Sequence, residues 1–231
     1  MEGCIAQGIN TWQSAGPSDL KYYRQHRKKD GKLQYISLAT KDAENPCFID
    51  RIVDAGAIAI AHHGEVTDRL FKADKIEMVQ DLLDGIRKRG VMAGVSTHMP
   101  SVIDYIEREG WDLDFYMTCI YERHRSRDEL KSMLDHVPIP IKEVYLEEDP
   151  PRMFEAMRQT SKPCLAFKIL AAGRICDSQE NVEQAFKSTL QQIKPNDALI
   201  VGMHTEYGDQ VRINAEYVQR FSGLSRGSVS S

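Results

Sequence analysis

The chain has 231 residues, of which 42% are hydrophobic and 28% are charged, and its formal net charge is −4. This length is enough for one large core, no apolar run approaches the roughly 20 residues that cross a bilayer, and the negative charge argues against a nucleic-acid binder. We therefore expect a small-molecule substrate as the partner, with neither nucleic acid nor membrane. The composition leaves the oligomeric state open.

The five cysteines form no CxxC pair, and their number is odd. A scattered set of this kind is typical of a reducing compartment, not of a disulfide framework. The first residues also show no charged segment followed by an apolar one, as a signal peptide would. These features predict a cytoplasmic protein.

Strand and helix patterns alternate along the chain from its first residues. The predicted strands are 9–12, 33–40, 57–61, 91–96, 113–120, 164–170 and 198–202. The predicted helices are 1–6, 18–27, 46–53, 73–89, 102–108, 127–134, 150–159, 178–193 and 210–221. Regular strand–helix alternation without a Gly-rich dinucleotide turn favours an α/β fold of the (β/α)8 TIM-barrel type. We expect one domain over residues 1–221 with seven parallel strands, a first strand–helix unit that is missing, and a disordered tail over 222–231.

The stretch AIAIAHHGE at 57–65 carries the first indication of a site. Its period-two alternation predicts a strand with alanines inside the barrel and isoleucines under the helices. In that phase His63 points into the barrel mouth and His62 points away, unless the strand bends at its end. Ligands meet barrel proteins at the carboxyl ends of the strands.

Polar residues follow strand after strand in the same way, and their recurrence predicts a site in the barrel mouth. They are Gln13, Lys41, His62, His63, Glu65, His98, Cys119, Tyr121, Glu122, Lys168 and His204. The long connection 122–144 follows the fifth strand, and long loops at a barrel mouth often serve as functional loops or lids.

Lys168 lies in the apolar segment LAFKIL. We expect Leu165, Phe167 and Ile169 on the helix-facing side, which leaves Ala166 and Lys168 inside the barrel. A lysine there needs an anionic partner or a wet pocket. The alternative is the reversed phase, with the lysine outside and three large apolar groups within.

These positions give a hypothesis about roles. A lysine beside a histidine suits the polarisation of a carbonyl and the movement of a proton, and Lys41 and His63 follow adjacent strands with the same inward phase. The predicted catalytic residues are Lys41, His63, His62 and Lys168. The predicted substrate-binding residues are Gln13, His98, Tyr121, Glu122 and His204.

The segments ISLATK and GVSTHMPSVIDYIEREGWDLDFYM, with a strand ending in histidine between them, resemble the aldo-keto reductase barrels. The segment DALIVGMHTEYGDQVRINAEYV is similar to the last strand and closing helix of that family. The resemblance implies an oxidoreductase that uses NADP(H), with an Asp-Tyr-Lys-His tetrad. Its lysine falls on Lys41 and its histidine on His62 or His63. Gln13 stands where the aspartate belongs, and no tyrosine follows at the family spacing, which argues against full reductase chemistry.

Three functions therefore compete. The first is an aldo-keto reductase-like enzyme for a small carbonyl or sugar-like substrate. The second is a cofactor-free or metal-dependent carbohydrate isomerase, lyase or epimerase, whose metal ligands would come from His63, Glu65, His98, Glu122 and His204, although no compact metal motif is present. The third is a barrel that binds ligands without catalysis.

Overall fold

The computed structural model describes residues 1–14, 19–29, 31–39, 46–138, 143–204, 206 and 208–223. The strands are β1 (Thr11–Ser14), β2 (Gln34–Ala39), β3 (Ala59–His62), β4 (Met92–Thr97), β5 (Phe115–Cys119), β6 (Cys164–Phe167) and β7 (Ala198–Ile200). The helices are α1 (Glu2–Ala6), α2 (Leu20–Lys28), α3 (Pro46–Asp54), α4 (Gly64–Lys72), α5 (Met78–Arg87), α6 (Pro100–Arg108), α7 (Arg127–Leu134), α8 (Asp149–Gln159), α9 (Gln179–Gln192) and α10 (Gln210–Phe221). A short 3-10 helix, Ala171–Gly173, follows β6.

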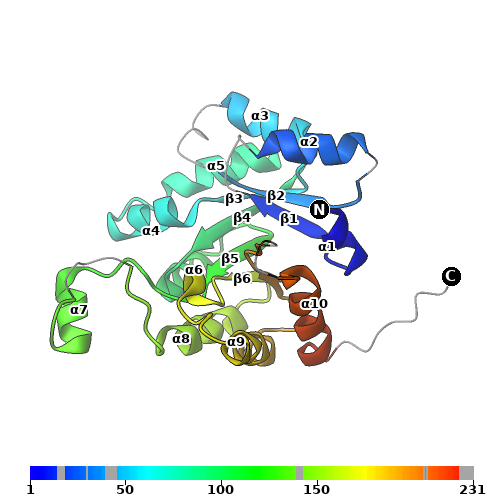
Figure 1. Cartoon of the computed structure of the whole chain (residues 1–231). Coiled ribbons are helices and arrows are strands. Elements are labelled where there is room, and N and C mark those ends of the chain that lie inside the picture. The colour runs from blue at the N-terminus through cyan, green and yellow to red at the C-terminus, as the bar shows by residue number, and fades with distance from the viewer. Residues whose placement is uncertain are drawn as a thin grey trace.

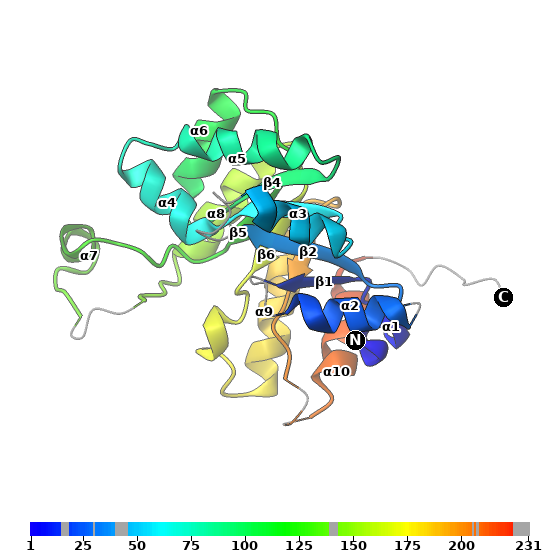
Figure 2. The same cartoon turned by 90° about the horizontal axis from the view of Figure 1, so that it is seen from above.

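The seven strands are all parallel and lie in chain order, from β1 to β7, in one curved sheet with helices outside it (Figures 1 and 2). Within the described residues, β1 and β7 are the two edges of this sheet. The predicted TIM-barrel-like fold with seven parallel strands is confirmed. The predicted missing unit concerns chain outside this sequence, the tail residues 224–231 lie outside the described residues, and both expectations stay predictions.

The register between strands shows which side chains face the barrel interior, because residues paired across parallel strands point to the same side. Ile36 pairs with Ala59, and Gly94 pairs with Phe115. Together the inward residues form a small apolar cluster that includes Ile36, Leu38, Ala59, Ala61, Phe115, Met117, Leu165, Phe167 and Ile200. The predicted inward alanines of β3 are confirmed.

Two predicted strand phases are wrong. In β6, Leu165 and Phe167 face the interior, whereas Ala166 belongs to the helix-facing layer. In β2, Ile36 faces the interior and Tyr35 packs under α2 against Tyr23. The error arose because both strands are apolar on both faces, so alternation alone does not tell inside from outside. The inward phase expected for Lys41 followed from that assignment, and Lys41 itself lies outside the described residues.

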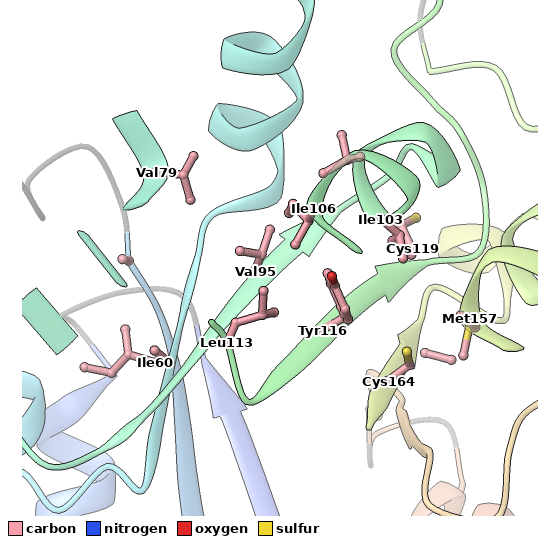
Figure 3. Close-up of a cluster of buried hydrophobic side chains, with 14 of the residues drawn as sticks. Ile60, Val79, Val95, Ile103, Ile106, Leu113, Tyr116, Cys119, Met157 and Cys164 are labelled. Atoms are coloured by element: carbon pink, nitrogen blue, oxygen red, sulfur yellow. The ribbon is translucent and has the colours of Figure 1, made fainter. Parts of the chain in front are cut away.

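The larger core lies between the strands and the helices. Figure 3 shows outward side chains of β3, β4 and β5, namely Ile60, Val95 and Tyr116, together with Ile103 and Ile106 of α6. Each of these side chains is at most about 1% exposed. This layer fixes the strands and helices, so the polar groups at the strand ends are held on a rigid frame.

The predicted helix 73–89 corresponds to α5, which spans Met78–Arg87, and the helix before it, α4, was not predicted. His63 occupies the N-cap position of α4 without a side-chain cap, and Asp74 after its end has a left-handed φ of 53°. A short helix with a glycine at its first position and no capping signal gives little periodicity to detect. Among the described residues, no helix is long and apolar enough to span a bilayer.

We predict that Gly94→Ala destabilises the barrel. A Cβ at this position would lie 2.5 Å from the ring of Phe115, and both residues face the filled interior. Overpacking of this kind costs about 1–3 kcal/mol. The urea midpoint should fall at unchanged slope, whereas Gly202→Ala, whose Cβ would meet nothing within 4 Å, should leave it nearly unchanged. Equal midpoints for the two variants would contradict the prediction.

Candidate active site

The carboxylate of Asp68 and the imidazole of His98 form a buried pair where α4 meets the end of β4. Nδ1 of His98 lies 2.6 Å from Oδ2 of Asp68, and the backbone N–H of His98 donates to the same oxygen at 3.1 Å. The hydroxyl of Thr97 donates to Oδ1 at 2.5 Å. Both members of the pair are less than 5% exposed, so the geometry is held by the interior of the protein.

This pair sets the tautomer of His98. A carboxylate only accepts hydrogen bonds, so Nδ1 of His98 carries a proton, and whenever the ring is neutral Nε2 is its acceptor. The ring packs edge-on against Phe167, with 5.7 Å between the ring centroids, and Phe167 faces the barrel interior. An Asp-oriented histidine at the mouth of a barrel has the arrangement of a general base.

His63 lies beside this pair, as its predicted inward phase requires. It follows β3 and begins α4, and its backbone N–H donates to the carbonyl of Ala39 at 3.1 Å. Its Nδ1 is buried and has no hydrogen-bond partner among the described residues. Burial lowers the pKa of His63; Glu65 opposes this with a smaller effect, and His98 adds to it. His63 is therefore a neutral imidazole with an unused polar atom, which suits contact with a ligand.

Arg123 and His124, which follow β5, lie beside His98. Nη2 of Arg123 donates to Nε2 of His124 at 2.9 Å, and the His124 ring lies edge-on to His98 at 5.2 Å between centroids. The carbonyl of His124 accepts from Nζ of Lys72 in α4 at 2.5 Å, which ties the loop after β5 to that helix. Burial and then the charge of Arg123 lower the pKa of His124, so this ring is also neutral near pH 7.

Lys168 lies at the site because of its backbone conformation, and not because of the predicted strand phase. The strand ends at Phe167, and Lys168 follows in a left-handed conformation with φ of 60°. Its Nζ donates to the hydroxyl of Tyr145 at 3.5 Å. Burial, then the charge of Arg123, lowers the pKa of Lys168. The lysine is thus at the barrel mouth although the strand phase that predicted it is wrong.

His62 lies on the helix-facing side of β3. Its Nδ1 lies 2.7 Å from the hydroxyl of Thr67, which donates to the carbonyl of His63, so the histidine is the donor of that pair. Burial, then the charge of His63, lowers the pKa of His62 to about 4. The residue points away from the mouth as predicted, and its part in catalysis stays a prediction without a contact to support it.

Glu122 lies in an ionic cluster that anchors the loop after β5. Its carboxylate lies 2.9 Å from Arg152 and 3.5 Å from Arg125, and Arg125 also pairs with the buried Asp149 at the start of α8. Its carboxylate is thus committed to these arginines, and its predicted contact with substrate has no support. Tyr121, by contrast, packs its ring against Tyr145 at 5.1 Å between centroids and so borders the site.

The remaining predicted residues are spread out. Gln13 pairs in register with Ile36, so it faces the barrel interior and is half-buried. His204 lies on the surface beside the start of α10, where its backbone N–H donates to the side chain of Gln210 at 2.7 Å. Lys41 lies outside the described residues.

Three residues of this site were missed in the sequence: Asp68, Arg123 and His124. Asp68 belongs to the unpredicted helix α4. Arg123 and His124 follow Tyr121 and Glu122 in the segment YERHR, and their polar character alone was the signal that could have included them. Among the described residues, no group of three or more His, Cys, Asp or Glu side chains is placed to hold a metal ion.

No family model and no curated protein matches this chain. Several solved structures share its fold. Orotidine 5'-monophosphate decarboxylase from Methanocaldococcus jannaschii has a TM-score of 0.57 and 14% identity, with 96% of this chain and 90% of that chain covered. The structure of 3-hexulose-6-phosphate synthase from Salmonella typhimurium has a TM-score of 0.55 and 13% identity, with 96% of this chain and 90% of that chain covered. A truncated 3-deoxy-D-arabino-heptulosonate 7-phosphate synthase from Thermotoga maritima has a TM-score of 0.56 and 12% identity, with 95% of this chain and 77% of that chain covered.

These neighbours correct the family expectation. They are decarboxylase and synthase barrels, and the resemblance to the aldo-keto reductases is wrong. The short segments ISLATK and GVS were not sufficient to establish it. NADP(H) was considered as a cofactor only because of that resemblance, and weak binding or none was expected from the incomplete tetrad; this expectation stays untested.

We predict that His62 makes stability depend on pH. Its folded pKa of about 4 lies below the unfolded value of 6.5, so the unfolded state binds more protons and stability falls as the pH drops through this range. Between pH 7.5 and 5 this effect amounts to about 2 kcal/mol. The unfolding free energy of His62→Gln should fall less over this range than that of the unchanged protein, and that of the exposed control His136→Gln should fall equally. An unchanged pH slope in His62→Gln would contradict the assignment.

Proposed function

We propose that this barrel is a lyase or isomerase that moves a proton on a small, anionic, sugar-like molecule. The observation that carries the proposal is the buried Asp68–His98 pair, with 2.6 Å between Nδ1 and the carboxylate, at the barrel mouth. An oriented neutral imidazole can take a proton from carbon next to a carbonyl, and this reaction class needs no redox cofactor.

The residues around His98 suit the rest of that step. When Nε2 of His98 takes the proton, the electron pair of the broken C–H bond moves into the carbonyl and leaves an enolate oxygen. Arg123 and Lys168 make this side of the mouth positive, and their field favours that negative charge without direct contact with the oxygen. His63, neutral and with a free Nδ1, is placed to return a proton at a second position. Return to a different carbon gives an isomer, and breakage of an adjacent bond gives a lyase.

The similar folds support this reaction class over a reductase. The neighbours are named as a decarboxylase and synthases, and their names describe phosphorylated compounds. At 12–14% identity they show the fold alone, so the residues of this chain must carry the chemistry. A barrel that only binds ligands would have no use for the oriented tautomer of His98.

We predict that the protein catalyses exchange of carbon-bound hydrogen with solvent. A panel of sugar phosphates and 2-oxo acids is incubated with it in deuterium oxide, and proton NMR follows the C–H signal next to the carbonyl. The signal of a substrate should disappear with the unchanged protein. His98→Asn should slow exchange by about 10²–10⁴-fold, because the base is removed.

Asp68→Asn is the second variant, and it should slow exchange by a similar factor because an amide can hold the wrong tautomer of His98. His136→Gln, an exposed histidine after α7, is the matched control and should exchange at the unchanged rate. Full exchange in His98→Asn, or no exchange with any member of the panel, would contradict the proposal.

A further inference from the structure

Two guanidinium groups contact the carboxylate of Glu143 at the edge of the barrel mouth, and the ammonium group of Lys168 is linked to it through the hydroxyl of Tyr145. Its Oε1 accepts from Nη1 of Arg123, and its Oε2 lies 3.8 Å from Nη2 of Arg174. The same Oε2 accepts from the hydroxyl of Tyr145 at 3.0 Å, and that hydroxyl accepts from Lys168. The guanidinium of Arg174 also lies over the Tyr145 ring, 4.2 Å from its centroid.

The charges of this group do not balance. Three cations lie around one carboxylate, which leaves an excess of two positive charges. Arg123 and Lys168 are half-buried, whereas Glu143 and Arg174 are exposed. Burial raises the pKa of Glu143, but the hydrogen bond from Tyr145 and the nearby cations outweigh it and leave the pKa lowered. Glu143 is therefore ionised and supplies its full single charge. A phosphate monoester carries about −1.5 to −2 at pH 7 and would match the three cations better than a carboxylate does.

The backbone around these cations is strained. Lys168, Ala171 and Ala172 all have left-handed φ values, between 48° and 60°. Each such residue is energetically unfavourable and persists where the surroundings impose it, which is often at ligand sites. The strained turn after β6 brings Arg174 to the Glu143 carboxylate and Lys168 to the Tyr145 hydroxyl that donates to it.

The group is continuous with the catalytic histidines. Arg123 contacts Glu143 through Nη1 and His124 through Nη2, and His124 packs against His98. A ligand whose anionic group sits on Arg123 would therefore extend its carbon chain toward His98. The arrangement separates a binding end of the substrate from a reacting end.

We infer that Arg123, Lys168 and Arg174 form the subsite for a phosphate monoester group of the substrate, and that Glu143 occupies this subsite in the free protein. This inference rests on the proposed function, because it assigns the anionic end of the molecule on which His98 acts. The substrate phosphate and the Glu143 carboxylate compete for the same three cations, so binding displaces the carboxylate.

The alternative is that Glu143 is only a structural ion pair that holds the segment before Tyr145. The two cases differ in the effect of Glu143→Gln. If the ion pair is only structural, this variant loses stability and gains no affinity for anions. If the carboxylate occupies a subsite, the variant leaves three cations without a competing anion and binds phosphate more tightly.

The test is the binding of inorganic phosphate, measured by isothermal titration calorimetry at low ionic strength. Glu143→Gln should tighten binding by about tenfold, and Lys168→Met and Arg174→Gln should each weaken it by about tenfold. Arg174 is half-exposed, so its variant keeps the test valid if Lys168→Met fails to fold. The matched control is Arg108→Gln, which removes an exposed arginine of α6 and should leave binding unchanged.

Acetate is the second probe, and it should bind at least tenfold more weakly than phosphate to Glu143→Gln. Equal binding of acetate and phosphate, or no gain in Glu143→Gln, would overturn the inference. Because binding is measured without turnover, the result is separate from that of hydrogen exchange. Exchange without phosphate binding would refute the subsite alone, and phosphate binding without exchange would refute the catalytic proposal alone.

Discussion

The carboxylate of Asp68 is the interaction on which the barrel mouth depends. It accepts from the hydroxyl of Thr97 and from the backbone and ring of His98, and so joins α4 to the end of β4. A buried carboxylate without these donors would cost several kcal/mol, which makes this one position of α4 strongly preferred. Since α4 begins at His63, the same contact also determines where that histidine lies.

The mouth combines neutral imidazoles with permanent cations, and the combination has a physical cause. Burial and the neighbouring guanidinium of Arg123 both disfavour the charged form of His124, and burial does the same for His63. The cations in turn are held by Glu143 and Tyr145. Neutral imidazoles and cationic side chains therefore lie close together at the barrel mouth without neutralising each other.

The sequence predicted the barrel, and the strand ends where the candidate residues lie, better than the orientation of single residues. The alternation in 57–61 was sufficient to place the alanines of β3 inside, because small and large residues there differ by face. In β6 both faces are apolar, and Lys168 leaves the strand through a left-handed residue that no periodic pattern encodes. Asp68 was out of reach for another reason: its importance comes from a partner 30 residues away, and its helix has no capping signal.

The left-handed backbone at Lys168 has a consequence for how this protein can change. Glycine adopts such a conformation without steric cost, so at this position it would relieve strain while removing the ammonium group. Selection for heat resistance alone would favour that exchange, and selection for ligand recognition would oppose it. Laboratory evolution for heat resistance alone should therefore replace Lys168 by glycine and yield a more stable but inactive barrel. Stability and ligand recognition thus favour different residues at position 168.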